Sequence, residues 1–119
     1  MDLSTGTNIL HDAVVETFTL DLPRRRLVVV VWEKKDGGAS FWSQLVISGI
    51  KNVGEAQQVQ ACIDTIVTRE KRVGLGYRID ELTLSKAADV QVALDIDHLP
   101  PLRLTCAKFT LQSLPEKPA

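Results

Sequence analysis

The alternation of apolar and polar side chains in residues 14–32 predicts two strands joined by a tight turn. Successive side chains of a strand point to opposite faces. One face of the first strand therefore carries Val14, Glu16, Phe18, Leu20 and Leu22, and the other carries Val15, Thr17, Thr19 and Asp21. We expect the first set to face the core, with Glu16 close to water at the start of the strand.

The second strand is predicted over residues 27–32, an unbroken apolar run with four consecutive valines. Branching at Cβ favours strand over helix for this run. Because both faces are apolar, we expect a central strand with cover on both sides. Pro23 and the arginines 24–26 form the turn between the two strands.

Four more segments carry strand patterns. Residues 41–50 place Leu45 and Ile47 on one face, and Gly49 near their end indicates a bulge or a close backbone approach. Residues 77–85 change face near 80–81, which predicts a bulge. Residues 90–96 alternate regularly. The last predicted strand, 102–111, changes parity near 107–108, so that either a bulge switches its register or both of its faces are covered.

One helix is predicted, over residues 54–70. Apolar residues recur there at the spacing of a single helical face: Val59, Cys62, Ile63, Ile66 and Val67. Asn52 and Glu55 fit a capping box before the helix, and Arg69, Lys71 and Arg72 suit its C-terminal dipole. A strand over 62–68 is the competing interpretation.

These elements predict an α+β fold, with a mostly antiparallel sheet of about six strands and one amphipathic helix on one face of the sheet. An all-β sandwich of two sheets is the alternative. The 119 residues suffice for a single domain, 1–119, with loose ends at 1–8 and 113–119.

Composition narrows the function classes. Hydrophobic residues make up 45% of the chain and charged residues 24%, as in ordinary globular proteins. The net charge of −1 and the 5% aromatic content argue against nucleic acid and against an anionic membrane as partners. Cys62 and Cys106 match no metal-binding spacing and are predicted to be reduced, buried thiols. The first ten residues lack the pattern of a signal peptide, which predicts a cytoplasmic protein.

Two groups of residues suggest metal or acid–base chemistry. His11 and Asp12 are adjacent, and Asp95, Asp97 and His98 follow one another at the end of a predicted strand. Four of these residues form a candidate metal site for a metal-dependent hydrolase: His11, Asp12, Asp97 and His98. The preferred interpretation is structural, with His11 and Asp12 in a strand-entry turn and the later acids on a solvated strand face.

Other chemistry has less support. Ser48-Gly49 lacks the remainder of a nucleophile elbow, and the glycines of 74–76 are too few for a phosphate-binding loop. The basic groups at 24–26, 34–35 and 69–72 could form one patch for an acidic partner, but they are more typical of solvated turns and helix ends. We therefore assign no catalytic residue, no metal ligand and no cofactor.

The first 50 residues resemble a group of small bacterial β-rich domains, some of them classed as immunity proteins of polymorphic toxin systems. The resemblance depends on His11-Asp12-Ala13, on the strands at 18–22 and 27–31, and on a strand at 45–50 that ends in Gly-Ile. The helix at 54–70 departs from that group. The resemblance implies a cytoplasmic, non-catalytic protein that binds a partner, and it supplies no catalytic residues.

Three functions follow as hypotheses. The first is a non-catalytic binding domain, of immunity-protein type, that acts through a protein-binding surface. The second is the metal-dependent hydrolase using His11, Asp12, Asp97 and His98. The third is a homodimeric structural protein that associates through an exposed sheet edge.

Overall fold

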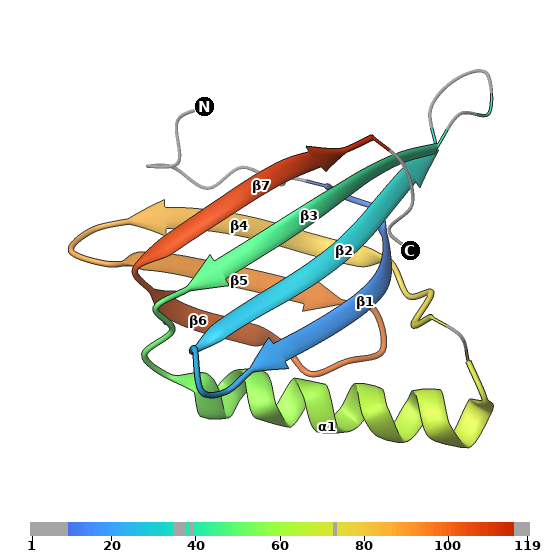
Figure 1. The fold of residues 1–119 in the computed structure, drawn as a ribbon, viewed down its shortest axis with the longest axis horizontal. Coiled ribbons are helices and arrows are strands. Elements are labelled where there is room, and N and C mark those ends of the chain that lie inside the picture. Colours follow the sequence, from blue (N-terminus) through green and yellow to red (C-terminus); the bar gives the residue numbers. More distant parts are fainter. Residues whose placement is uncertain (1–9, 35–37, 39, 73, 116–119) are drawn as a thin grey trace.

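The computed structural model describes residues 10–34, 38, 40–72 and 74–115. In chain order these residues form β1 (Val14–Asp21), β2 (Arg26–Lys34), β3 (Ser40–Ser48), α1 (Val53–Glu70), β4 (Ile79–Lys86), β5 (Val90–Ile96), β6 (Leu102–Cys106) and β7 (Lys108–Leu114). Figure 1 shows this arrangement of antiparallel strands with one helix. The predicted α+β class is confirmed.

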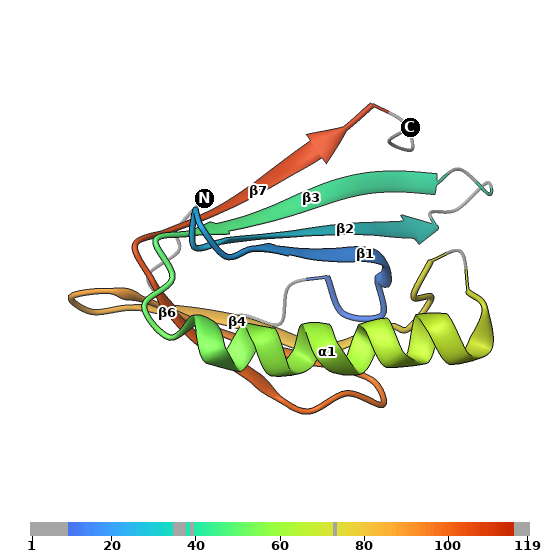
Figure 2. The ribbon, with the colours of Figure 1, turned by 60° about the horizontal axis from the view of Figure 1, so that its bottom comes forward.

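The strands divide between two sheets, one with the order β1-β2-β3-β7 and the other with the order β4-β5-β6. The two sheets face each other as layers (Figure 2), instead of forming one sheet with the helix on its face. The division arises at Ala107, whose amide donates to the carbonyls of Ser48 (3.1 Å) and Gly49 (3.2 Å). The single strand predicted over 102–111 is therefore two strands in different sheets, and the parity change marks the transfer.

The core lies between the inner faces of the two sheets and α1. β2 lies between β1 and β3, which confirms its central position, and its side chains Leu27, Val29 and Val31 are each 0% exposed. The opposing sheet contributes alternate residues of β4, β5 and β6, among them Leu84, Leu94 and Leu104. No buried residue of the described chain is polar or charged.

A bulge changes the inward face of β1. The pairing with β2 shifts register between Val15 and Thr17, so Val15 is fully buried while Val14 is half-buried on the other face. The prediction that Val14 and Glu16 share the inner face with Phe18 is therefore wrong. The segment after α1 occupies the bulge, because the amide of Leu75 donates to the Glu16 carbonyl at 3.0 Å.

The helix forms where it was predicted, and the alternative of a strand over 62–68 is wrong. Its buried residues are Ala56, Val59 and Ile63, whereas Cys62 and Ile66 are half-buried. The buried face thus shares Val59 and Ile63 with the predicted one, Val67 also packs against the core, and the face is rotated toward Ala56. α1 lies along one side of the two layers, in contact with β1 and β6 (Figures 1 and 2).

Asn52 holds the start of α1 against β6 and does not form the predicted capping box. Its side chain makes no cap hydrogen bond; its Nδ2 donates to the carbonyl of Arg103 at 2.8 Å, and its Oδ1 accepts from the amide of Thr105 at 2.9 Å. Further along α1, the Gln60 Oε1 accepts from the amide of Leu20 at 3.1 Å. The side chains of Asn52 and Gln60 thereby form hydrogen bonds with backbone groups of the edge strands β6 and β1.

Two smaller predictions are confirmed and one is corrected. The bulge near 80–81 appears as a register shift between Ile79 and Glu81, and Gly49 lies against Ala107 with a positive φ of 65°. Ser113 and Leu114 belong to β7 and not to a loose tail. The predicted loose residues 1–8 and 116–119 lie outside the described residues.

Candidate functional site

The outer face of the four-stranded sheet is the main candidate for a functional surface, and Figure 1 looks onto it. Side chains alternate along each strand, so those that do not enter the core point to this outer face. Four rows cross the sheet, and each row contains one residue from β1, β2, β3 and β7 in that order. The rows are Asp21, Arg26, Ser48 and Lys108; Thr19, Val28, Val46 and Thr110; Thr17, Val30, Gln44 and Gln112; and Val14, Trp32, Trp42 and Leu114. We call these residues the outer face.

The middle two strands of the outer face carry an apolar strip, interrupted by Gln44. Val28 and Val46 lie side by side, and the rings of Trp32 and Trp42 have centroids 6.1 Å apart. Val30 is only 9% exposed although it lies outside the core cluster, because its neighbours cover it. No helix or strand of the described residues lies over this face (Figures 1 and 2), so the expected cover on both sides of β2 is absent there.

The charged residues of the outer face lie at its two ends, with Lys34, which pairs with Ser40, at the end away from the β1–β2 turn. Asp21, Arg26 and Lys108 share the row nearest the β1–β2 turn. The inner rows hold only threonine, glutamine and apolar side chains, and the Gln44 amide donates to the Gln112 Oε1 at 3.1 Å. Such a surface, uncharged at its centre and charged at its rim, matches the anatomy of protein–protein interfaces.

The outer face of the second sheet provides a comparison within the same protein. Its paired residues are mostly polar or charged: Glu81, Thr83, Ser85, Gln91, Ala93, Asp95, Arg103 and Thr105. Arg103 and Asp95 form a bidentate ion pair there, at 2.6 and 3.3 Å, and hydrogen bonding to Asp95 raises the pKa of the Arg103 guanidinium. This is an ordinary solvated sheet face, which makes the apolar character of the other face more notable.

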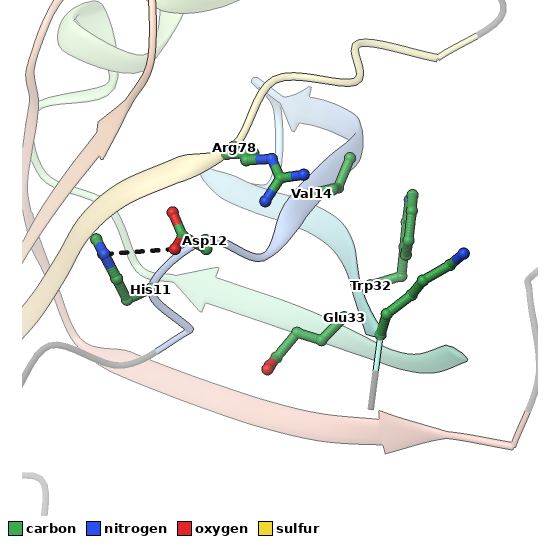
Figure 3. A pocket seen from close by; sticks show the side chains of 7 residues that line it. His11, Asp12, Val14, Trp32, Glu33 and Arg78 are labelled. Carbon is green, nitrogen blue, oxygen red and sulfur yellow. Dashed lines mark ion pairs between the residues drawn. The ribbon is translucent and has the colours of Figure 1, made fainter. Parts of the chain in front are cut away.

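A second candidate is a cleft of about 390 Å³ beside the start of β1 (Figure 3). His11 and Asp12 line it from the segment before β1, Trp32 and Glu33 from β2, and Arg78 from the segment before β4. The His11 Nε2 lies 3.6 Å from the Asp12 carboxylate, and its Nδ1 lies 2.8 Å from the Asp80 carbonyl oxygen. His11 thus bonds to a residue distant in sequence instead of making the local bond expected of a strand-entry turn.

The later acids and His98 lie at a different place. Asp97 and His98 line a separate cleft at the turn after β5, while His11 and Asp12 line the one beside β1. The His98 ring contacts Tyr77, with ring centroids 5.0 Å apart. Within the described part of the chain, no three His, Cys, Asp or Glu side chains lie close enough to share a metal ion. The four predicted metal candidates therefore do not converge.

The basic groups and the cysteines are likewise dispersed. Arg24 pairs with Asp21 at 3.2 Å at the β1–β2 turn, whereas Arg72 pairs with Glu70 at 2.8 Å beyond the far end of α1 (Figure 1). Lys35 lies outside the described residues. Cys62 and Cys106 are free thiols, the first half-buried and the second buried, and burial raises the pKa of Cys106.

Sequence reasoning placed most residues of the outer face in strands, with Arg26 in a turn and Leu114 in a loose tail, but did not identify the face as a site. The available signal was the two-sided apolar run at 27–32, together with Trp42 and Val46 on the opposite parity to Leu45. Arg78 and Glu33, which line the His11 cleft, carried no such signal because their proximity depends on tertiary pairing.

Within the described residues α1 is the only helix, and it is not long and apolar enough to cross a membrane. No protein-family model matches the chain, and neither the curated proteins nor the solved structures yield a match.

Proposed function

We propose that this protein is a non-catalytic binding domain that acts through the outer face of the four-stranded sheet. The observation that carries the proposal is the apolar strip formed by Val28, Val46, Trp32 and Trp42, four half-buried residues over which no helix or strand of the described residues lies (Figures 1 and 2). Contiguous exposed apolar patches on small domains commonly mark interaction sites. Tryptophan is also among the residues most enriched at the centres of protein interfaces.

The metal-dependent hydrolase is a weaker proposal, because its four residues line two separate clefts. An acid–base or metal mechanism requires its groups to converge within hydrogen-bond reach of one reacting atom. The resemblance of the first 50 residues to small bacterial β-rich domains, some of them classed as immunity proteins, implies a binding role, and the binding proposal does not depend on it.

The test compares two substitutions of the same chemistry on the two outer faces. Val46→Glu places a carboxylate at the centre of the apolar face, and Ala93→Glu places one at the half-buried centre of the polar face. The immobilised wild type and both variants, matched for far-UV circular dichroism, are incubated with cell extract to which a differently tagged copy of the chain is added.

We expect proteins that the wild type and Ala93→Glu retain to be lost from Val46→Glu, because a buried unpaired carboxylate opposes association. Equal retention by all three proteins, or no retention above the level of a bare matrix, would contradict a role for this face.

A further inference from the structure

We infer that the occupant of the outer face is a second copy of this chain, bound across a two-fold axis that runs parallel to the strands between β2 and β3. The inference depends on the proposed function and names the partner. It follows from the order of side chains across the sheet and from the shape of a twisted sheet.

The rows of the outer face read nearly the same in both directions. From β1 to β7 one row is Thr19, Val28, Val46 and Thr110, and another has Trp32 and Trp42 at its centre with Val14 and Leu114 outside. A two-fold axis along the strands would place β2 of one copy over β3 of the other. Val28 would then meet Val46 of the second copy, and Trp32 would meet its Trp42.

The charged row follows the same symmetry. Asp21 on β1 and Lys108 on β7 are its outermost members. The two-fold axis brings β1 of one copy over β7 of the other, so Asp21 would face Lys108 of the second copy, and the reverse pair would form by symmetry. An isologous interface requires this self-complementarity. The row of Thr17, Val30, Gln44 and Gln112 is less symmetric, since Val30 would meet a glutamine.

The shape of the sheet is compatible with this axis. A twisted sheet is saddle-shaped, and rotation by a half turn about an axis along its central strands produces a saddle of the same twist. Two such faces therefore remain at an even spacing, as in aligned sheet packing, where strand directions differ by about 30° or less. Pairing at a sheet edge is the alternative. It is restricted at β1 and β6, because Gln60 of α1 and Asn52 already form hydrogen bonds with backbone amides of these edge strands.

The area of the face lies at or below the lower limit for a specific dimer. Four strands at about 4.8 Å spacing and seven residues at about 3.3 Å cover roughly 450 Å² in projection, before side-chain relief is added. Specific interfaces begin at about 600 Å² per partner. We therefore expect a dimer that dissociates on dilution.

The experiment uses sedimentation velocity and intrinsic fluorescence over a dilution series that reaches several hundred micromolar. The two tryptophans of the chain both lie on the outer face, so their emission reports its coverage without a label. We expect the mass to approach twice the 13.1 kDa of the chain, with a blue shift of emission over the same concentrations. Val46→Glu should remain monomeric, and Ala93→Glu should behave as the wild type.

A charge exchange tests the axis itself. Lys108→Asp should weaken the dimer at least about tenfold by opposing like charges, and the double variant Asp21→Lys/Lys108→Asp should recover most of that loss. Thermal unfolding of each variant at low concentration controls for the loss of the bond between Asp21 and Arg24.

Three results would overturn the inference. They are a monomer at every concentration, a dimer that survives Val46→Glu, and a double variant no tighter than Lys108→Asp. A dimer that survives Val46→Glu would indicate pairing through a sheet edge, such as β4 or β7. A monomeric wild type whose captured proteins are still lost on Val46→Glu would leave the proposed function intact and assign the face to a different protein.

Discussion

Substitution of Gly49 by alanine tests whether the two sheets are joined as described. Gly49 follows β3 and has a φ of +65°, which lies in the left-handed region that is unfavourable for residues other than glycine. A Cβ built on Gly49 would stand 2.6 Å from the Cβ of Ala107, the residue at which the chain passes from one sheet to the other. The substitution therefore meets two separate obstacles.

The expected loss is the sum of two terms. The left-handed conformation costs about 1–2 kcal/mol for a residue with a Cβ. Inserting a methyl group into a closely packed contact typically costs about 1–3 kcal/mol. Gly49→Ala should thus lower the free energy of unfolding by about 2–5 kcal/mol, a large share of the 5–15 kcal/mol that is usual for a domain.

Urea denaturation followed by far-UV circular dichroism measures this loss. All samples are kept at one low protein concentration, since self-association would add to the apparent stability. Gly54→Ala is the matched control: a Cβ at Gly54 meets nothing within 4 Å, and its position in α1 predicts a gain of up to about 1 kcal/mol.

Removal of the Ala107 methyl group separates the two terms. In the Gly49→Ala background, Ala107→Gly relieves the overlap but leaves the cost of the positive φ, so about half of the loss should return. The reasoning would be refuted if the free energy of unfolding of Gly49→Ala differed from that of the wild type by less than about 1 kcal/mol, after allowing for the uncertainty of the extrapolation. A double variant no more stable than Gly49→Ala would refute the steric part alone.

Three further predictions concern other parts of the molecule. Asn52→Ala removes two hydrogen bonds from the helix start to β6, and should lower the free energy of unfolding by about 1–3 kcal/mol in the same urea assay. Leu45→Ala, at a fully buried position, should cost about 2–5 kcal/mol, while Leu22→Ala at a position 44% exposed should change stability little. Because burial raises the pKa of the Cys106 thiol, the unfolded chain loses that proton first; the stability should fall as pH rises above about 8.5, and less so in Cys106→Ala.

The parts of the fold that depend on local periodicity could be predicted from sequence. The helix is signalled by apolar residues at helical spacing, and the strand at 90–96 by strict alternation. In both cases the determinant is which face of one element is apolar, and neighbouring residues in the chain contain that information.

The errors arise where the partner strand decides the geometry. Residues 102–111 read as one strand because nothing local distinguishes a bulge from a transfer between sheets. That difference depends on which carbonyls accept the amide of Ala107, and those belong to residues 48 and 49. The bulge at Glu16 likewise exists because residues 75 and 76 bond to β1 there. Both cases require long-range hydrogen bonds that alternation does not encode.

The site was predictable only in part for a similar reason. Residue type alone grouped His11 and Asp12 with Asp97 and His98, but the chain carries the two pairs to different clefts. The run at 27–32 correctly indicated a central strand, but in the part of the chain that the structure describes the cover predicted for both of its faces is present on one face only. It could not indicate that, among the described residues, helices and strands cover only the inner face.

The energetics of that uncovered side explain why we expect a weak partner complex instead of a permanent one. If about 900 Å² is buried in total and somewhat more than half of it is apolar, the hydrophobic gain is on the order of 13 kcal/mol. Association itself costs an estimated 4–15 kcal/mol. The difference depends on how well Trp32 and Trp42 pack against their counterparts, since aromatic pairs contribute about 0.5–1.5 kcal/mol beyond area. Trp32→Ala should therefore weaken the dimer more than Thr110→Ala at the outer strand, and equal effects would mean that the centre of this face is not the contact.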